Sequence, residues 1–425
     1  MTSLPLALQL LRSARLVDGS MVDVELAGGM VSAVLPAGVG AAADPDGVLD
    51  LDGFLLLPAP ADPHAHLDKA RSWDAIRPPA GDLVSAIACW RAYAADMPVA
   101  DVADRAREQA LAMLANGTTA VRSHVDILLG DAPLRGVEAL LQVREELAGL
   151  IDIELVALTG QDTPDRDIEA ALDLGVDTVG GAPHLALDPL GELHRLLDLA
   201  ERRGVDIDLH TDENLDGPLT LGDFADRVTG WRQNVSAGHC VRLGTLPAAE
   251  RDALIARVVV ARIGIIANPI TNLFLQGWDH PASTPRGLTA ARALLDAGAR
   301  FAAGADNVRD PFNPLGRSDA LETAMLLVVA GHLTPTEAYA AVSSGAREVL
   351  ALPSAGPVVG AAAELLAVRG TSLADVIAAA PADRFVIHRG SLVARSTVSR
   401  QVALPVKSTS APARPPTPAR EEVTP

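Results

Sequence analysis

Residues 54–69 read FLLLPAPADPHAHLDK and join an apolar run to a closely spaced pair of histidines. The run has the length and composition of a buried strand, and we expect it to open a series of parallel strands. In an extended segment the side chains of His64 and His66 point to the same side, because residues two apart share a face. Two imidazoles that project together from a strand end can share one metal ion.

Beyond this stretch, short apolar segments alternate with longer segments of helical period, such as 101–115, 190–203 and 289–297. Several of the short segments are apolar on both faces, as strands of a parallel sheet covered by helices are. Eight strand–helix units over about 250 residues are typical of a closed (β/α)8 barrel of the TIM type. The expected strands are 54–60, 118–126, 151–159, 177–182, 205–210, 234–239, 263–269 and 300–306.

The two ends of the chain have a different texture. Residues 7–50 and about 356–400 consist of short alternating segments cut by Gly and Asp turns, a pattern that predicts short strands. We therefore expect an α/β protein with the barrel in residues 54–350 and a small β-sandwich assembled from residues 1–53 and 351–402. The segment 403–425 is rich in Pro, Ser and Thr and is expected to be a disordered tail.

Composition narrows the classes of partner. The 425 residues are 49 % hydrophobic and carry a formal net charge of -19, which repels phosphate backbones, so we expect no nucleic-acid partner. We also expect no membrane attachment, because apolar runs fall short of the roughly 20 residues of a membrane helix. The apolar start lacks a basic segment and a cleavage site, and the two cysteines lie far apart. These features predict a cytoplasmic protein without a signal peptide. The sequence leaves open whether the protein forms a homo-oligomer.

Polar residues recur where the expected strands end, which is the end of a barrel at which active sites form. HTDE at 210–213 ends the fifth strand, His239 ends the sixth, and Asp306 ends the eighth. A single histidine is more often a surface or hydrogen-bonding residue than a ligand. The ordered set of HxH, HxxE, His and Asp at four strand ends, however, is typical of a metal site. Nitrogen and oxygen ligands of this kind suit iron(II) or zinc.

These motifs resemble those of the amidohydrolase superfamily, and more closely those of its bacterial cytosine deaminase-like branch. The resemblance runs from about Ala14 to Arg395. It implies a (β/α)8 barrel with a small β-sandwich made from both termini, in agreement with the pattern described above. The motifs that carry it include PHAHLDKA at 63–70, VRSHVDI at 121–127, DIDLHTDEN at 206–214 and GADNVRDPFNPLG at 304–316.

Carried over residue by residue, the resemblance implies roles for the residues at the strand ends. Glu213 would be the general acid/base, His239 would hold the attacking hydroxide, and Asp306 would take a proton from the water. Gln161 matches a glutamine that binds the amide edge of the ring, although the preceding ALTG differs from the usual apolar–Pro run. The ligands of one divalent ion, Fe2+ or Zn2+, would be His64, His66, His210 and Asp306.

Three further residues expected to bind the substrate depart from the cytosine deaminases. Asn307 stands where those enzymes commonly have a second Asp, and Phe312 stands where they commonly have Trp. Lys69 differs from the cytosine enzymes but resembles other members, including N-isopropylammelide amidohydrolases. Binuclear members bridge their metals with a carboxylated lysine on the fourth strand, whereas residues 177–184 read DTVGGAPH and contain no lysine. The sequence therefore favours a mononuclear site and leaves the substrate open.

Other residues near the expected strand ends have weaker signals. His124 and His184 would line the pocket or make structural hydrogen bonds. Asn268 and Gln276 would contact substrate or cap the chain, and Trp90 would form a rim or pack in the core.

The sequence thus predicts a metal-dependent hydrolase that releases ammonia from an amino-substituted heterocycle, cytosine or a related base. Alternatives within the fold are amine removal from a triazine, isoguanine, isocytosine, creatinine or a pterin. The adenosine deaminase branch shares HxH and HxxE but typically lacks the two-ended sandwich. The cytidine deaminase fold is excluded because the two cysteines, Cys89 and Cys240, cannot form its PCxxC pair. A barrel that only binds a ligand is disfavoured by the full ligand set with Glu213.

Overall fold

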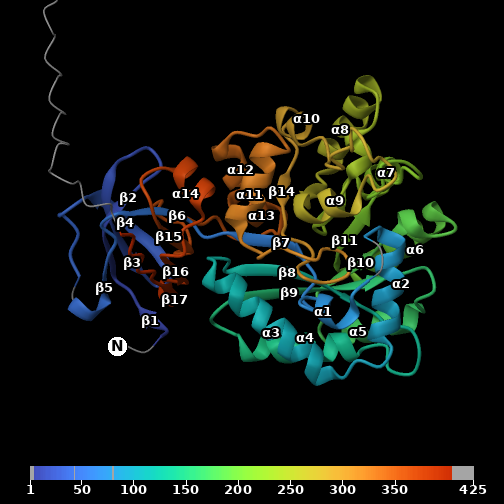
Figure 1. Ribbon diagram of the computed structural model, residues 1–425, viewed down its shortest axis with the longest axis horizontal. Coiled ribbons are helices and arrows are strands. Elements are labelled where there is room, and N and C mark those ends of the chain that lie inside the picture. Colours follow the sequence, from blue (N-terminus) through green and yellow to red (C-terminus); the bar gives the residue numbers. More distant parts are fainter. Residues whose placement is uncertain (1–3, 43, 79–80, 404–425) are drawn as a thin grey trace, which may run out of the picture.

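The computed structural model describes residues 4–403, apart from residues 43, 79 and 80. Two sheets organise these residues, one of eight parallel strands and one of nine mostly antiparallel strands (Figure 1). The tail predicted to be disordered, 403–425, lies outside the described residues except for its first residue. No helix in the described part of the chain is long and apolar enough to span a membrane.

The eight-stranded sheet is the predicted barrel. Its strands pair in sequence order, each parallel to the next. The last strand returns to the first, where the backbone N–H of Asp306 donates to the carbonyl of His64 at 2.8 Å. The (β/α)8 fold class is therefore confirmed. The strands are β7 (Ala61–Ala65), β8 (Ala120–Asp126), β9 (Asp152–Thr159), β10 (Thr178–Gly181), β11 (Asp206–Thr211), β12 (Val235–His239), β13 (Gly264–Ala267) and β14 (Phe301–Ala303).

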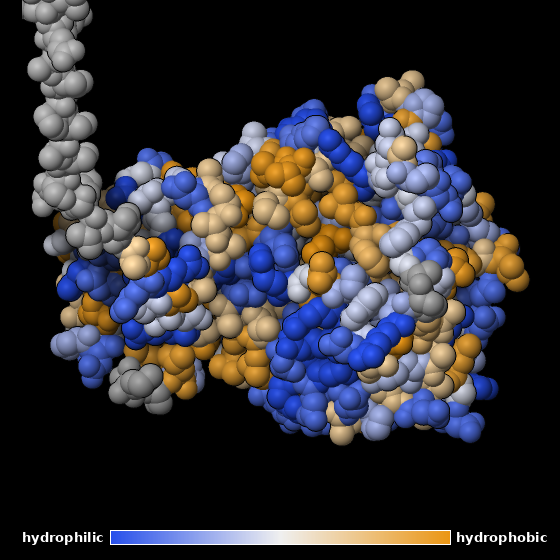
Figure 2. All heavy atoms as spheres, in the orientation of Figure 1, coloured by the Kyte–Doolittle hydropathy of each residue, from blue (hydrophilic) through white to orange (hydrophobic). Residues whose placement is uncertain are grey.

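Helices surround the barrel in the positions that the alternating pattern predicted (Figure 1). In Figure 2 the face over α3 and α4 is mainly hydrophilic, as the water-facing sides of such helices should be. The helices are α1 (Trp73–Ile76), α2 (Leu83–Ala94), α3 (Val99–Ala115), α4 (Arg135–Glu146), α5 (Asp165–Leu174), α6 (Pro189–Arg203), α7 (Leu221–Val228), α8 (Ala248–Ala261), α9 (Pro269–Leu275), α10 (Ala291–Asp296), α11 (Ala320–Val329), α12 (Pro335–Ala341), α13 (Ser344–Val349) and α14 (Leu373–Ala379). Short 3-10 turns lie at Pro45–Gly47, Pro183–Leu185 and Val241–Gly244.

Helix α6 shows how local sequence sets these elements. The side chain of Asp188 accepts a hydrogen bond from the backbone N–H of Gly191 and caps the first turn, where Pro189 needs no partner. Gly204 ends the helix in the left-handed conformation, with φ of 68°, which glycine adopts without steric cost. The face turned to the barrel is apolar at helical spacing and is formed by Leu193, Leu196, Leu197 and Ala200.

Both chain ends build the second sheet, which we call the terminal domain. Strands from residues 6–58 pair with strands from residues 365–396, as the sequence predicted. Their order is β1-β17-β16-β15-β6-β2-β3-β4, with β5 beside β2. The strands are β1 (Leu6–Ala7), β2 (Leu10–Arg15), β3 (Met21–Ala27), β4 (Met30–Pro36), β5 (Val48–Asp50), β6 (Phe54–Pro58), β15 (Leu365–Arg369), β16 (Arg384–His388) and β17 (Ser391–Ser396).

The prediction that residues 54–60 form the first barrel strand was wrong. The apolar run at 54–60 forms β6, which pairs with β15 and β2 of the terminal domain, and the barrel begins only at Ala61. The run is apolar on both faces for a different reason. Leu55 and Leu57 pack into the barrel-side core, whereas Phe54 and Leu56 pack into the core of the terminal domain.

A buried ion pair ties the terminal domain to the barrel. The guanidinium of Arg384, on β16, makes two hydrogen bonds to the carboxylate of Asp319, at 3.0 and 2.7 Å. It also donates to the backbone carbonyl of Asn116 at the end of α3. The same carboxylate caps α11 by accepting from the backbone N–H of Leu321. One aspartate therefore neutralises a buried cation and starts a helix.

We expect Asp319→Ala to lower the free energy of unfolding by about 3–5 kcal/mol, because it leaves the charge of Arg384 buried without a partner. Unfolding in urea measures this change. Asp226→Ala is the matched control, since it breaks an exposed pair with Arg257 and should cost about 1 kcal/mol or less. Equal losses of unfolding free energy in the two variants would contradict a special role of the Asp319–Arg384 ion pair.

Candidate active site

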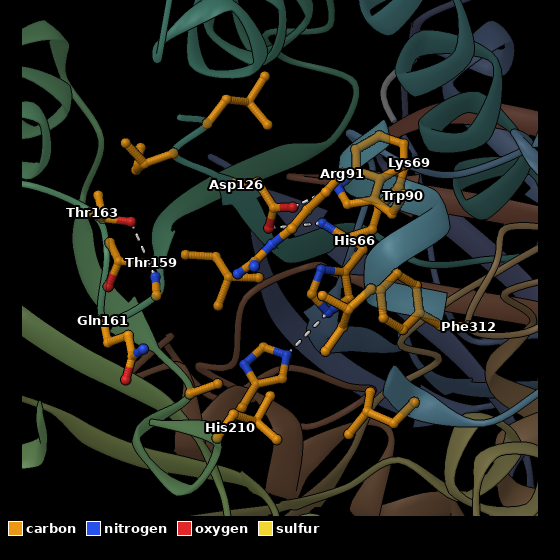
Figure 3. Close-up of a pocket in the computed structure, with 18 of the residues that line it drawn as sticks. His66, Lys69, Trp90, Arg91, Asp126, Thr159, Gln161, Thr163, His210 and Phe312 are labelled. Carbon is orange, nitrogen blue, oxygen red and sulfur yellow. Dashed lines mark hydrogen bonds and ion pairs between the residues drawn. The ribbon is translucent and has the colours of Figure 1, made fainter. Parts of the chain in front are cut away.

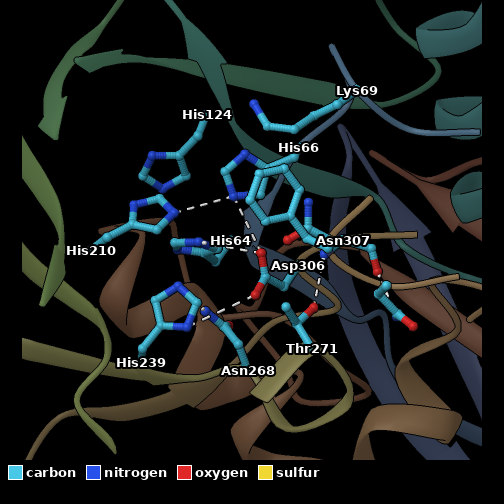
Figure 4. Close-up of polar contacts among 12 residues, drawn as sticks. His64, His66, Lys69, His124, His210, His239, Asn268, Thr271, Asp306 and Asn307 are labelled. Atoms are coloured by element: carbon cyan, nitrogen blue, oxygen red, sulfur yellow. Dashed lines mark hydrogen bonds and ion pairs between the residues drawn. The ribbon is translucent and has the colours of Figure 1, made fainter. Parts of the chain in front are cut away.

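Imidazoles and a carboxylate from distant parts of the chain meet at the carboxyl end of the barrel (Figure 4). The Nε2 atom of His66 lies 3.2 Å from Nε2 of His210 and 3.2 Å from Oδ1 of Asp306. Nε2 of His64 lies 3.7 Å from the same Oδ1 atom. The structure thus brings together the four side chains that the sequence singled out as metal ligands.

These side chains fit a cation. Burial lowers the pKa of His64, His66 and His210 well below its usual value, so the rings are neutral, and burial raises the pKa of Asp306. Both ring nitrogens of His64 and both carboxylate oxygens of Asp306 are buried without a hydrogen-bond partner among the described residues. Unpaired buried polar atoms cost free energy, and a divalent ion would accept their lone pairs. Among the described residues three triads could hold an ion: His64–His66–Asp306, His64–His210–His239 and His64–His124–Asp208.

The backbone aims these groups by local strain and close packing. Asp306 and His239 have φ of 56° and 67°, a left-handed conformation that is uncommon outside glycine. The carboxylate of Asp62 accepts from the backbone N–H groups of His64 and Ala305 and so joins the first strand to the last. At position 238 only glycine fits, because an added Cβ would lie 2.8 Å from the ring of His64.

Glu213 and His239 lie beside this set. One oxygen of Glu213 is 3.5 Å from Nδ1 of His239, and burial raises the pKa of Glu213 to about 8. Burial lowers the pKa of His239 to about 3, and its two ring nitrogens contact the amides of Asn272 at 3.0 Å and Asn268 at 3.4 Å. At neutral pH the carboxyl of Glu213 therefore carries a proton while the imidazole of His239 is neutral.

A cavity of about 390 Å³ opens above these residues (Figure 3). Its floor is polar and includes His66, His210, Glu213 and Asp306. Its walls are mostly apolar and aromatic, formed in part by Ile87, Trp90, Leu128, Leu158 and Phe312. A polar floor under apolar walls is the usual form of a small-molecule site.

The four residues expected to bind substrate all line this cavity. Phe312 belongs to its wall. The amide nitrogen of Asn307 donates to Asp310 at 2.8 Å, and Gln161 lies at the exposed rim, where its carbonyl oxygen accepts from the backbone N–H of Leu187 at 2.6 Å. The geometry therefore places these residues around a substrate, and their contacts with it stay a prediction.

Lys69 is engaged by the protein itself. Its Nζ lies 3.0 Å from a carboxylate oxygen of Asp68 and 3.0 Å from one of Asp126, and 5.1 Å from the centre of the Trp90 ring. Burial opposes its charged form, but Asp126 and Asp68 outweigh burial and raise the pKa of Lys69. The side chain is thus a paired cation in the cavity wall, and β10 supplies no lysine that could bridge two metals.

The weaker candidates take different positions. His124 lies beside the ligand set, with its ring centre 4.2 Å from that of His64, and is not among the residues that line the cavity. His184 contacts the backbone carbonyl of His210 at 3.1 Å. Gln276 donates to the backbone carbonyl of Glu213, and Trp90 lines the cavity wall.

Sequence reasoning missed the charged residues Asp126, Arg91 and Asp162 of the cavity wall. Asp126 follows His124 by two positions on β8, so the spacing used for His64 and His66 could have found it. Arg91 lies on α2, outside the strand ends, and no pattern in the sequence distinguishes it from the other arginines.

Comparison with known proteins agrees with this geometry. The amidohydrolase family profile matches residues 47–402. A pterin deaminase of Rhizobium rhizogenes is 32 % identical over 391 residues, which cover 88 % of each protein. A 5-methylcytosine deaminase from Klebsiella pneumoniae, crystallised with 5-fluorocytosine, superposes with a TM-score of 0.83 at 26 % identity, covering 93 % of this chain and 99 % of that one.

A third relative is named for the hydrolysis of an isopropylamino group. It is an N-isopropylammelide isopropylaminohydrolase from Burkholderia multivorans, which superposes with a TM-score of 0.77 at 29 % identity, covering 91 % of this chain and 98 % of that one. With the family match over most of the chain and the shared barrel, the protein belongs to the amidohydrolase family, in its cytosine deaminase-like branch.

Proposed function

We propose that the protein is a metal-dependent deaminase that hydrolyses an amino-substituted nitrogen heterocycle and releases ammonia. The observation that carries this proposal is the proximity of two groups at one cavity floor. One is a His/Asp set in which His64 and Asp306 have no hydrogen-bond partner among the described residues, and the other is the buried, protonated Glu213. Two of the similar proteins are named as deaminases of such rings, which supports the reaction class.

The ion would be held by His64, His66, His210 and Asp306, a set of nitrogen and oxygen donors that suits iron(II) or zinc. When bound, such an ion lowers the pKa of a water towards neutrality and so supplies hydroxide for attack. We infer one ion per chain, because Lys69, the only lysine among the described residues, is held as a cation between two carboxylates.

The side chains divide the proton transfers among them. Asp306 accepts the proton that the attacking water loses and later passes it to the leaving amine. Glu213 donates its proton to the ring nitrogen next to the carbon under attack. His239, held by Asn272 and Asn268, orients the water and stabilises developing charge. A C–O bond forms, and the C–N bond breaks as ammonia leaves. The hydroxyl proton then passes to Glu213, which leaves a ring carbonyl and restores the acid.

For the ring itself we favour a bicyclic pterin over the cytosine expected from the sequence. The cavity of about 390 Å³ is in the range that holds drug-sized ligands, and a single pyrimidine would fill only part of it. The relative named as a pterin deaminase matches over 88 % of both chains. Cytosine is the second candidate, favoured by the structural likeness to the 5-methylcytosine deaminase.

A substrate comparison tests the reaction and the ring together. Purified protein of known metal content is assayed for ammonia release from pterin, cytosine, 5-methylcytosine and isoguanine, and for isopropylamine release from N-isopropylammelide. We expect the highest kcat/KM with pterin. A higher kcat/KM with cytosine would show that the substrate is a pyrimidine and not a pterin. A higher kcat/KM with N-isopropylammelide would show that the enzyme removes a substituted amine and not ammonia. No reaction with any of these compounds would contradict the proposed deaminase activity.

Metal analysis tests the ligand set. We expect about one equivalent of iron or zinc per wild-type chain, and His66→Ala should lose most of it because an imidazole ligand is missing. Treatment with a chelator should abolish activity, and added metal should restore it to the wild-type protein alone. His194→Ala changes a half-exposed histidine that pairs with Asp223 and should keep its metal. Two equivalents per chain would contradict the mononuclear site.

Substitution of the proposed acid tests its role. We expect Glu213→Gln to lower kcat by about 10²- to 10⁴-fold, because the amide cannot transfer the proton, while metal content stays unchanged. Glu250→Gln, an exposed change on α8, serves as the control for loss of a carboxylate. Normal turnover by Glu213→Gln would remove Glu213 from the mechanism.

The rate should also depend on pH in a definite direction. With a pKa of about 8, Glu213 holds its proton below pH 8 and loses it above, so kcat should decline as the pH rises through 8. The residual activity of Glu213→Gln should lack this decline, because the amide does not titrate there. A rate that increases steadily from pH 7 to pH 9 would show that the protonated acid is not required.

A further inference from the structure

Arg91 reaches into the cavity from α2 (Figure 3). The side chain lines the cavity and is exposed, whereas His66 and His210 on the floor are buried. Its guanidinium extends towards the chain that follows β9, since a Cβ built on Gly160 would lie 3.5 Å from Nη2 of Arg91. Arg91 therefore crosses the outer part of the cavity, above the reacting end.

The described part of the chain supplies no partner for this guanidinium. Among the residues that the structure describes, no carboxylate or carbonyl forms a hydrogen bond or ion pair with Arg91, whereas Lys69 on the same wall is bound by two acids. Asp126 is not free to serve Arg91, because its oxygens already contact Lys69 at 3.0 Å and the indole N–H of Trp90 at 2.5 Å. The cavity wall thus keeps one unpaired positive charge.

The comparison with Arg195 shows that arginines of this region are otherwise well bound. Arg195, on α6, pairs with Glu192 and Asp165 and donates to the carbonyls of Thr163 and Gly160. These acceptors are therefore already occupied by a neighbouring cation. Because Arg91 is exposed, water is its acceptor until a molecule in the cavity supplies a stronger one.

The chemistry of that acceptor follows from the guanidinium. It is always charged, and its planar fork of N–H donors matches the two oxygens of a carboxylate. Ile87, Leu128 and Leu158 are half-buried apolar residues of the same wall, and a ligand seated against them would displace water and strengthen such a contact. Building on the deaminase proposed above, we propose that Arg91 binds a carboxylate that the substrate ring carries away from its reacting amino group, and so selects acidic ring derivatives.

One acidic residue near the mouth opposes an anion and sharpens the test. Asp162 also lines the cavity, is exposed, and has no ion-pair partner among the described residues. Its negative charge should weaken carboxylate binding, whereas the positive charge of Arg91 should strengthen it. Removing the two charges in separate variants should therefore change the same preference in opposite directions.

The experiment measures kcat and KM for a ring with and without a carboxylate. The pair is pterin and pterin-6-carboxylate, or cytosine and cytosine-5-carboxylate if the wild-type protein acts on the pyrimidine. For the acidic ring we expect Arg91→Ala to raise KM by about tenfold to one hundredfold, with kcat less affected. The neutral ring should show a smaller change, Arg91→Lys should recover part of the loss, and Asp162→Asn should lower KM for the acidic ring. Arg166→Ala, an exposed change on α5, should alter neither ring.

The outcomes separate this proposal from the deaminase itself. Suppose that the wild-type protein deaminates the neutral ring and that Arg91→Ala affects both rings equally or neither. The proposed carboxylate site at Arg91 is then wrong, whereas the proposed deaminase activity is retained. If the wild-type protein deaminates no ring, equilibrium binding of the same pairs is measured instead. Tighter binding of the acidic ring that is lost in Arg91→Ala would support the carboxylate site, although the proposed reaction would be wrong. If the wild-type protein then binds the acidic and the neutral ring equally well, both the carboxylate site and the deaminase activity are contradicted.

Discussion

The structure depends on a set of buried groups that cannot satisfy one another. Neutral imidazoles from two separate strands approach a carboxylate whose two oxygens have no hydrogen-bond partner among the described residues. A packed barrel interior offers these groups no water, so their lone pairs must be met by a cation or left at a cost. A functional site can tolerate this loss of free energy, because a bound ion would both offset it and take part in the chemistry. The left-handed backbone at His239 and Asp306 is a second local cost borne for the same geometry.

The layer beneath the ligand set explains why it can be held in place. Arg122, almost fully buried on β8, pairs with Glu154 at 2.8 Å and Asp208 at 3.0 Å and donates to Ser236 at 2.9 Å. This network joins β8, β9, β11 and β12 across the barrel interior. Asp208 also lies 3.8 Å from Nε2 of His124, which packs against the ligand histidines. A buried charge with several partners resists displacement, because loss of any one partner leaves it uncompensated. The barrel interior therefore supplies a rigid polar base rather than an apolar core at this level.

The sequence predicted those parts of the molecule whose meaning lies in spacing along the chain. HxH, HxxE and the final Asp follow strands, and parallel strands bring their carboxyl ends to one edge, so the floor of the site could be inferred before the fold was known. The run at 54–60 misled because a strand between two cores is apolar on both faces, just as a barrel strand is. The engagement of Lys69 by two acids and the isolation of Arg91 could not be predicted, because both are statements about neighbours that only the folded chain brings together.

Floor and wall of the cavity carry different information. The floor is built from strand ends, whose positions the barrel fixes, and this is why proteins named for pterin, 5-methylcytosine and N-isopropylammelide share one fold with this chain. The wall is built from α2 and the segments after β7, β8, β9, β10 and β14, which can change without disturbing the barrel. Its two cations differ in what they can offer a ligand. Lys69 is neutralised by Asp68 and Asp126 and contributes mainly shape, whereas Arg91 keeps its charge for whatever enters the cavity. Membership of the family follows from the floor, and the choice among substrates has to be made by the wall.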